Sequence, residues 1–125
     1  MGDLTTNFSR VEMKCRCGKC DGIADMAMEF MAKLQAARST ADRAFMITSG
    51  YRCPQHPESV KRPTSSHTIG RAADIATADS RSRHVVVRAL MRSGFTRIGI
   101  GKDFIHVDDD PDKATHVIWD YYEAL

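Results

Sequence analysis

Two short segments of the chain combine strong metal ligands with side chains that can accept protons. The first segment contains His67 and Asp74, and the second contains Asp103, His106 and Asp108. Two imidazoles and one carboxylate leave one position of a tetrahedral zinc ion open for water, as in catalytic rather than structural zinc sites. Zinc lowers the pKa of its bound water to about 7 and polarises a carbonyl, so a positioned base would complete a hydrolytic site. The residue types therefore suit metal-assisted hydrolysis, although a His and an Asp at such spacing are also common without a metal.

The second segment alternates like a half-buried strand. Ile105 and Val107 face one side, and His106 and Asp108 face the other, where they would line a polar cleft. Asp103 precedes this strand at a turn, so its side chain can escape the alternation and approach the same metal as a general base. Asp108 is the competing candidate for the base, or it could orient an imidazole as a hydrogen-bond partner outside the ligand set.

Three sequence blocks occur in the order of a known peptidase family. They are Thr48-Ser49-Gly50-Tyr51-Arg52-Cys53-Pro54-Gln55-His56, then S-x-H-x-x-G-x-A-x-D-I over residues 65–75, then D-x-x-H-x-D over residues 103–108. In these blocks the chain resembles the zinc D-alanyl-D-alanine carboxypeptidases and L-alanyl-D-glutamate endopeptidases. These bacterial and phage peptidoglycan peptidases share a fold with the hedgehog signalling domain. The similarity spans about residues 8–119, and the second block is highly specific.

The resemblance implies a role for each residue of the two metal-binding segments. It makes His67, Asp74 and His106 the zinc ligands and Asp103 the general base. The implied activity is zinc-dependent hydrolysis of peptide bonds in peptidoglycan stem peptides, of the D-Ala-D-Ala carboxypeptidase or the L-Ala-D-Glu endopeptidase type. The alternative is a non-catalytic zinc-containing binding module, because a fold alone does not guarantee chemistry. The presence of Asp103 favours the enzyme.

The resemblance also implies two substrate-binding residues. Arg52 falls where the family keeps an arginine that binds a substrate carboxylate, and a guanidinium fork suits that task. Ser65 falls where a serine lines the cleft, although a serine before a tight turn also serves as a local cap. Many relatives continue with His-Asn and Val-Gly-Gly, whereas residues 56–62 here lack those glycines and add Lys61 and Arg62. These charges could attract an anionic wall peptide or simply form a solvated loop.

The four cysteines form a separate group. Cys15, Cys17 and Cys20 crowd into six positions, with spacing that could hold a metal, and Cys53 or His56 could supply the fourth ligand. We favour a second, structural zinc that ties the N-terminal arm to the substrate loop, with reduced thiols or a disulfide to Cys53 as alternatives. A zinc knuckle for single-stranded nucleic acid fits poorly, because the spacing is irregular and few aromatic residues flank it.

Composition excludes several classes of protein. The 125 residues include 18 Lys and Arg against 16 Asp and Glu, and a net charge of +2 is too small to argue for duplex binding. The apolar fraction of 42% and the charged fraction of 27% exclude disorder, collagen and coiled coil. No apolar run reaches the roughly 18 residues of a membrane helix. Composition therefore gives no reason to expect a nucleic-acid or membrane partner. The partner that the resemblance implies is a peptidoglycan peptide, and we expect a monomer.

The first residues resemble no secretory signal, because they lack a basic segment and an apolar segment. We accordingly expect synthesis in the cytoplasm. The protein would then act on the cell wall when released in phage lysis, or on wall precursors in the cytoplasm.

The apolar patterns around these residues predict the helices and strands that must position them, within one α+β domain over residues 1–125. Apolar spacing predicts helices over residues 23–38 and 80–93, with Ile23, Met26, Ala27, Phe30, Met31 and Leu34 inward in the first and Val86, Val87, Leu90 and Met91 in the second. Short apolar runs predict strands over residues 44–48, 72–77, 96–100 and 104–108. Without a repeating βαβ rhythm, a small antiparallel sheet with flanking helices is favoured. Residues 1–14 should wrap the surface, 51–66 should form a long loop, and Val117, Ile118, Trp119 and Tyr122 should close over the core.

Overall fold

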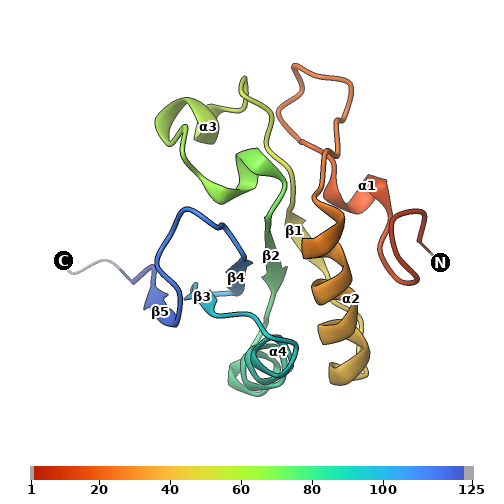
Figure 1. The fold of residues 1–125 in the computed structure, drawn as a ribbon, viewed down its shortest axis with the longest axis vertical. Coiled ribbons are helices and arrows are strands. Elements are labelled where there is room, and N and C mark those ends of the chain that lie inside the picture. The colour runs from red at the N-terminus through yellow and green to blue at the C-terminus, as the bar shows by residue number, and fades with distance from the viewer. Residues whose placement is uncertain (1, 123–125) are drawn as a thin grey trace.

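A five-stranded sheet lies at the centre of the fold in the computed structural model, which describes residues 2–122 (Figure 1). The strands are β1 (Ile47–Ser49), β2 (Ala72–Ala76), β3 (Arg97–Ile100), β4 (Phe104–Asp108) and β5 (Val117–Asp120), in the order β1-β2-β4-β3-β5. The first four pair antiparallel with their neighbours, whereas β5 pairs parallel with β3. The α+β class is confirmed, but the sheet is mixed rather than antiparallel throughout, because the chain crosses from β4 to the outer side of β3 before it enters β5.

The two long helices, α2 (Met28–Ala41) and α4 (Ser80–Arg92), cover one face of this sheet. Two short helices, α1 (Arg10–Met13) and α3 (Pro57–Lys61), and a 3-10 turn, η1 (Ser66–Ile69), lie in the connecting segments. The core forms where α2 and α4 pack together and onto the strands, through Phe30, Met31, Leu34, Val86 and Leu90 from the helices and Ala73, Ile75, Ile98, Ile105 and Val107 from the strands. Within residues 2–122, no helix has the length and apolar character of a membrane span. The opposite face of β2 and β4 carries the polar side chains Asp74, His106 and Asp108.

Helix α2 begins at Met28 rather than at residue 23. The backbone before it is extended and bonds to distant segments: the Cys15 amide donates to the Ile23 carbonyl, and the Ala27 amide donates to the Gly70 carbonyl. These tertiary hydrogen bonds replace the expected first turns. Ile23 is 45% exposed, so its predicted inward position was wrong.

Helix α4 matches its predicted bounds closely. The Asp79 carboxylate accepts a hydrogen bond of 2.8 Å from the Ser82 amide, which caps the helix start. Val86 and Leu90 are buried as predicted, but Met91 is 49% exposed, so its predicted inward position was wrong.

The two terminal segments contribute more than was predicted. Phe8 and Met13 are fully buried, so the described part of the predicted surface segment, residues 2–14, contributes to the core as well as covering the surface. At the other end, β5 extends the sheet, and Ile118 and Tyr122 are about half exposed rather than closed over the core. Strand pairing with β3 sets these directions, since successive side chains point to opposite faces.

Candidate active site

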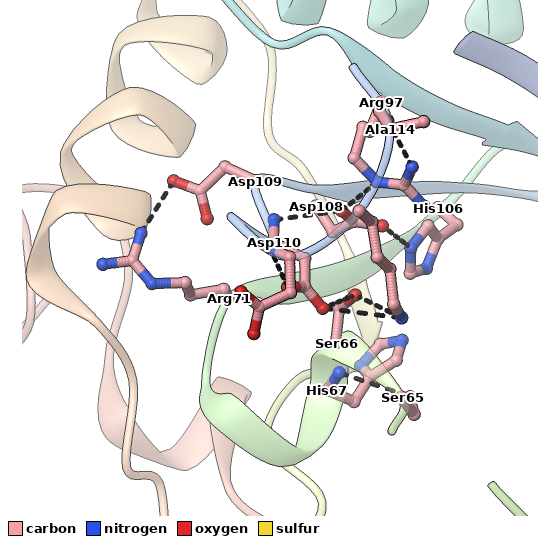
Figure 2. A network of polar contacts seen from close by, with 12 residues as sticks. Ser65, Ser66, His67, Arg71, Arg97, His106, Asp108, Asp109, Asp110 and Ala114 are labelled. Carbon is pink, nitrogen blue, oxygen red and sulfur yellow. Dashed lines mark hydrogen bonds and ion pairs between the residues drawn. The ribbon is translucent and has the colours of Figure 1, made fainter. Parts of the chain in front are cut away.

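Three side chains from separate elements meet on the polar face of the sheet. His67 comes from η1, Asp74 from β2 and His106 from β4, and the strand register sets Asp74 directly opposite His106. Asp74 Oδ1 lies 3.0 Å from His106 Nδ1 and 3.4 Å from His67 Nε2. One ligand atom from each residue lies within 4.8 Å of the others. Figure 2 shows the two imidazoles side by side.

Each imidazole is held at its far nitrogen by a hydrogen-bond acceptor. His67 Nδ1 lies 2.7 Å from the Gly50 carbonyl oxygen, and His106 Nε2 lies 2.7 Å from Asp108 Oδ2. A proton on each of these nitrogens leaves the other nitrogen, which faces Asp74, able to bind a metal. Metal-binding histidines are commonly oriented in this way. Two imidazoles and a carboxylate thus fit zinc, with one tetrahedral position open.

The turn that carries His67 depends on Ser65 and Gly70. The Ser65 hydroxyl accepts a hydrogen bond of 3.3 Å from the His67 amide and so caps η1. Gly70 ends η1 at φ +70°, and a Cβ there would collide with the Asp25 carbonyl oxygen. Only glycine suits both conditions, and the chain can therefore turn directly from His67 into β2. Ser65 also lines the cleft, and its contact with substrate stays a prediction.

Buried charges around the histidines hold one another in place. Burial opposes ionisation of Asp108, but its hydrogen bond to His106 and its ion pair with Arg97, at 2.6 Å, lower its pKa. Burial likewise opposes ionisation of Asp74, yet hydrogen bonds to His106 and His67 lower its pKa well below the ordinary range. For His106, burial lowers the pKa, but Asp108 and Asp74 raise it to a value above normal. A metal ion that binds here must displace the resulting proton.

The three residues lie in an open cleft of about 570 Å³. Its walls are rich in basic and aromatic side chains, namely Arg52, Lys61, Arg62, Arg97, Lys113, Phe104, Trp119 and Tyr121. Arg52 Nη2 lies 3.5 Å from Asp74 Oδ2, and Arg52 Nε donates to the Ser49 hydroxyl at 3.1 Å. The cleft thus offers positive charge beside the three candidate ligands.

A comparison with protein-family models identifies the chain by the same segments. A family described as Peptidase M15 matches residues 6–108, which include all three sequence blocks and the three converging side chains. The chain belongs to the peptidase M15 family. No curated protein matches this M15 chain. Membership implies a metallopeptidase, and M15 peptidases are zinc-dependent, in agreement with the donor set of His67, Asp74 and His106.

In this M15 domain, Asp103 lies in the turn that joins β3 to β4. Its side chain is exposed and is not among the residues that line the cleft, and its carbonyl accepts a hydrogen bond from the Thr77 amide. The hydrogen bond from the Gly101 amide to the Phe104 carbonyl closes a tight turn that keeps Asp103 at the outer corner. The role of Asp103 as general base stays a prediction, whereas Asp108 lines the cleft and contacts His106.

Sequence reasoning missed the aromatic wall of the M15 cleft. The ring centroid of Trp119 lies 5.6 Å from that of His106. A Cβ on Gly99 would lie 2.8 Å from Trp119 Nε1 and 2.7 Å from a ring carbon of Tyr121. A glycine within a strand pattern often marks such a close approach, so Gly99 was the available signal.

The four cysteines of the M15 chain also converge, away from the cleft. Cys15, Cys17, Cys20 and Cys53 are free thiols whose sulfur atoms lie within 4.8 Å of one another. His56 is not part of this group. Its Nδ1 accepts a hydrogen bond from the Glu58 amide and caps α3. The Lys19 amide lowers the pKa of Cys17 to about 6, whereas burial raises that of Cys53 to about 12.

Proposed function

We propose that the protein is a zinc-dependent peptidase that hydrolyses peptide bonds in peptidoglycan stem peptides, as a D-Ala-D-Ala carboxypeptidase or an L-Ala-D-Glu endopeptidase. The observation that carries the proposal is the convergence of His67 Nε2, Asp74 and His106 Nδ1 within an open cleft. Bound zinc would supply an activated water and polarise the scissile carbonyl. We further propose action on the wall after release by lysis, or on wall precursors in the cytoplasm.

Asp108 serves in this proposal as a positioning residue. Its Oδ2 contacts His106 Nε2, while its Oδ1 accepts hydrogen bonds from Arg97 and from the Asp110 amide (Figure 2). Both oxygens are thus engaged, and the buried carboxylate holds the proton on Nε2 of His106. The same engagement makes Asp108 a poor acceptor for a proton from an attacking water.

Asp103 is the proposed general base. Its exposed side chain must turn toward the cleft when substrate binds, and catalytic contacts often tighten only in the substrate complex. The carboxylate then takes a proton from the attacking water and returns it to the leaving amine nitrogen. This role rests on the D-x-x-H block that ends at His106.

The substrate groups that fit this cleft are carboxylates. Arg52 has a side chain that is 18% exposed, so its fork can receive a carboxylate of the stem peptide beside Asp74. Within residues 2–122, the ion pairs of Lys61 and Arg62 are exposed ones with Glu58, at 3.8 and 3.6 Å. Such pairs contribute about 0–1 kcal/mol, which leaves both side chains free to attract an anionic peptide.

The direct test is mass spectrometry of purified peptidoglycan and its muropeptides after incubation with the protein. We expect release of a defined fragment that a zinc chelator abolishes, and its mass names the bond that is cut. A protein that holds zinc in the cleft but yields no product from any wall preparation would instead be a non-catalytic binding module.

Variants separate metal binding from proton transfer in the same assay. His67→Ala should lose both the cleft metal and turnover. Asp103→Asn should keep the metal and lose about 10²–10⁴-fold in turnover, the usual contribution of a general base. A near-normal rate for Asp103→Asn would transfer the base role to Asp108.

A further inference from the structure

The four thiols outside the cleft have the spacing of a metal site. Cys17 Sγ lies 3.5 Å from Cys53 Sγ and 3.7 Å from Cys20 Sγ. A tetrahedral zinc ion with bonds of about 2.3 Å to sulfur sets neighbouring sulfurs about 3.8 Å apart. The cluster therefore already approximates the edges of such a tetrahedron.

Backbone amides point at two of these sulfurs. The Lys19 amide donates to Cys17 Sγ, and the Cys53 amide donates to Cys15 Sγ, each at 3.2 Å. Gly18, at φ +77°, gives the chain between Cys17 and Cys20 the turn that directs the Lys19 amide back at the sulfur. Hydrogen bonds of this kind stabilise thiolates, which are the form of cysteine that binds a metal.

We propose that Cys15, Cys17, Cys20 and Cys53 bind one structural zinc ion. Four thiolates fill all the tetrahedral positions and leave none for water, which distinguishes this site from the cleft. Soft sulfur ligands select zinc over calcium or magnesium. Three ligands come from the N-terminal segment and one from the loop after β1, so the ion cross-links segments more than 30 residues apart.

The position of the cross-link connects it to the cleft. Cys53 directly follows Arg52, and the Tyr51 amide on the other side donates to the Met13 carbonyl. The zinc would thus anchor the chain on the Cys53 side of Arg52, whereas the hydrogen bond to Met13 anchors the Tyr51 side. The Arg52 guanidinium between these anchors contacts Asp74 at 3.5 Å. This consequence for substrate binding rests on the proposed function, whereas the metal site itself does not.

The test is the metal content of the full-length chain, purified without chelator, together with cobalt substitution. We expect two equivalents of zinc in the wild type and one in His67→Ala. Cobalt bound to the cysteines should give an intense thiolate-to-cobalt charge-transfer band in both proteins. His67→Ala removes a cleft ligand and leaves the thiols intact, so failure of the cleft proposal and failure of this one give different results.

Cys20→Ser removes one ligand of the cysteine site, as His67→Ala removes one ligand of the cleft. It should lose one zinc equivalent and weaken the charge-transfer band several-fold, whereas His84→Ala, a change on α4 outside both groups, should alter neither. The band of the wild type keeps the test valid even if Cys20→Ser folds poorly. No thiolate band in cobalt-loaded wild type, four thiols that react freely in the native protein, or a mass showing a disulfide would each overturn the proposal.

Discussion

His106 has a partner at each ring nitrogen, and the partner at the far nitrogen decides which nitrogen can face a metal. Asp108 Oδ2 accepts a hydrogen bond from His106 Nε2 at 2.7 Å, and Asp108 Oδ1 in turn accepts one from Arg97 Nε at 2.6 Å. Arg97 therefore orients Asp108, and Asp108, two positions after His106 in the sequence, sets the tautomer of that candidate ligand. Orientation by such partners commonly determines how well a histidine binds its metal.

Asp108→Asn should weaken zinc binding in the cleft about 10–100-fold, because an amide can hold the wrong tautomer of His106. Zinc affinity is measured by competition with an indicator. Asp109→Asn is the matched control, since Asp109 pairs with Lys33 and Arg71, each at 3.2 Å, rather than with a candidate ligand. Equal loss in both variants would refute the positioning role of Asp108.

Arg52→Lys keeps the charge beside Asp74 but loses the fork that matches a carboxylate. We expect kcat/KM for a stem peptide to fall at least about tenfold, the value of a charged hydrogen bond, with zinc content unchanged. Steady-state kinetics on the muropeptide identified by mass spectrometry checks this, with exposed Arg62→Lys as control. A loss confined to zinc content would assign Arg52 to the integrity of the metal centre instead.

At the scale of elements, the contact of β3 with β5 builds the aromatic wall. Gly99 pairs with His106 on one side and with Trp119 on the other. The missing side chain gives Trp119 and Tyr121 room to lie over the sheet beside the cleft. One small residue therefore determines the shape of a surface to which three strands contribute.

Gly99→Ala should displace Trp119 and change its fluorescence, which is specific because the chain has a single tryptophan. We expect lower activity with unchanged zinc content. Gly94→Ala is the control: Gly94 also tolerates a side chain poorly, at φ +93°, but a Cβ there meets no atom within 4 Å. It should lower stability without moving the Trp119 emission. Identical spectra for Gly99→Ala and wild type would contradict the packing argument.

The start of α4 gives stability a pH dependence. Hydrogen bonds from Ser82 to Asp79 lower the pKa of that carboxyl below its ordinary value. A lowered folded-state pKa contributes stability above the unfolded-state pKa, near 4, and that contribution disappears as pH falls through the folded value. Asp79→Ala should therefore lower Tm at pH 7, and the deficit should shrink as pH falls from about 5 to about 2.

Thermal unfolding followed by circular dichroism measures that deficit at each pH. Asp79→Asn keeps an acceptor for the Ser82 amide without a titrating group, so it should be more stable than Asp79→Ala at every pH. A deficit of Asp79→Ala that stays constant down to about pH 2 would show that the charge of Asp79 contributes nothing.

For the molecule as a whole, the sequence was informative where chemistry is local. The S-x-H-x-x-G-x-A-x-D block fixes a cap, a glycine turn and a strand, so the placement of His67 near Asp74 could be predicted. The start of α2 at Met28 could not be predicted, because it depends on the hydrogen bond between Ala27 and Gly70, which are distant in sequence. The parallel pairing of β5 depends likewise on tertiary contacts that residue patterns do not encode, whereas the turn that carries Asp103 was predicted because it is local.

The order of the two ligand groups along the chain has a consequence during synthesis. The last of the four cysteines is Cys53, whereas the cleft is complete only with His106 in β4. A nascent chain thus contains every thiol of the cluster before β2, β3 or β4 has left the ribosome. A product truncated before β4 could still acquire metal at the thiols, yet it would lack a ligand that hydrolysis requires, so unfinished chains are inert toward peptide bonds.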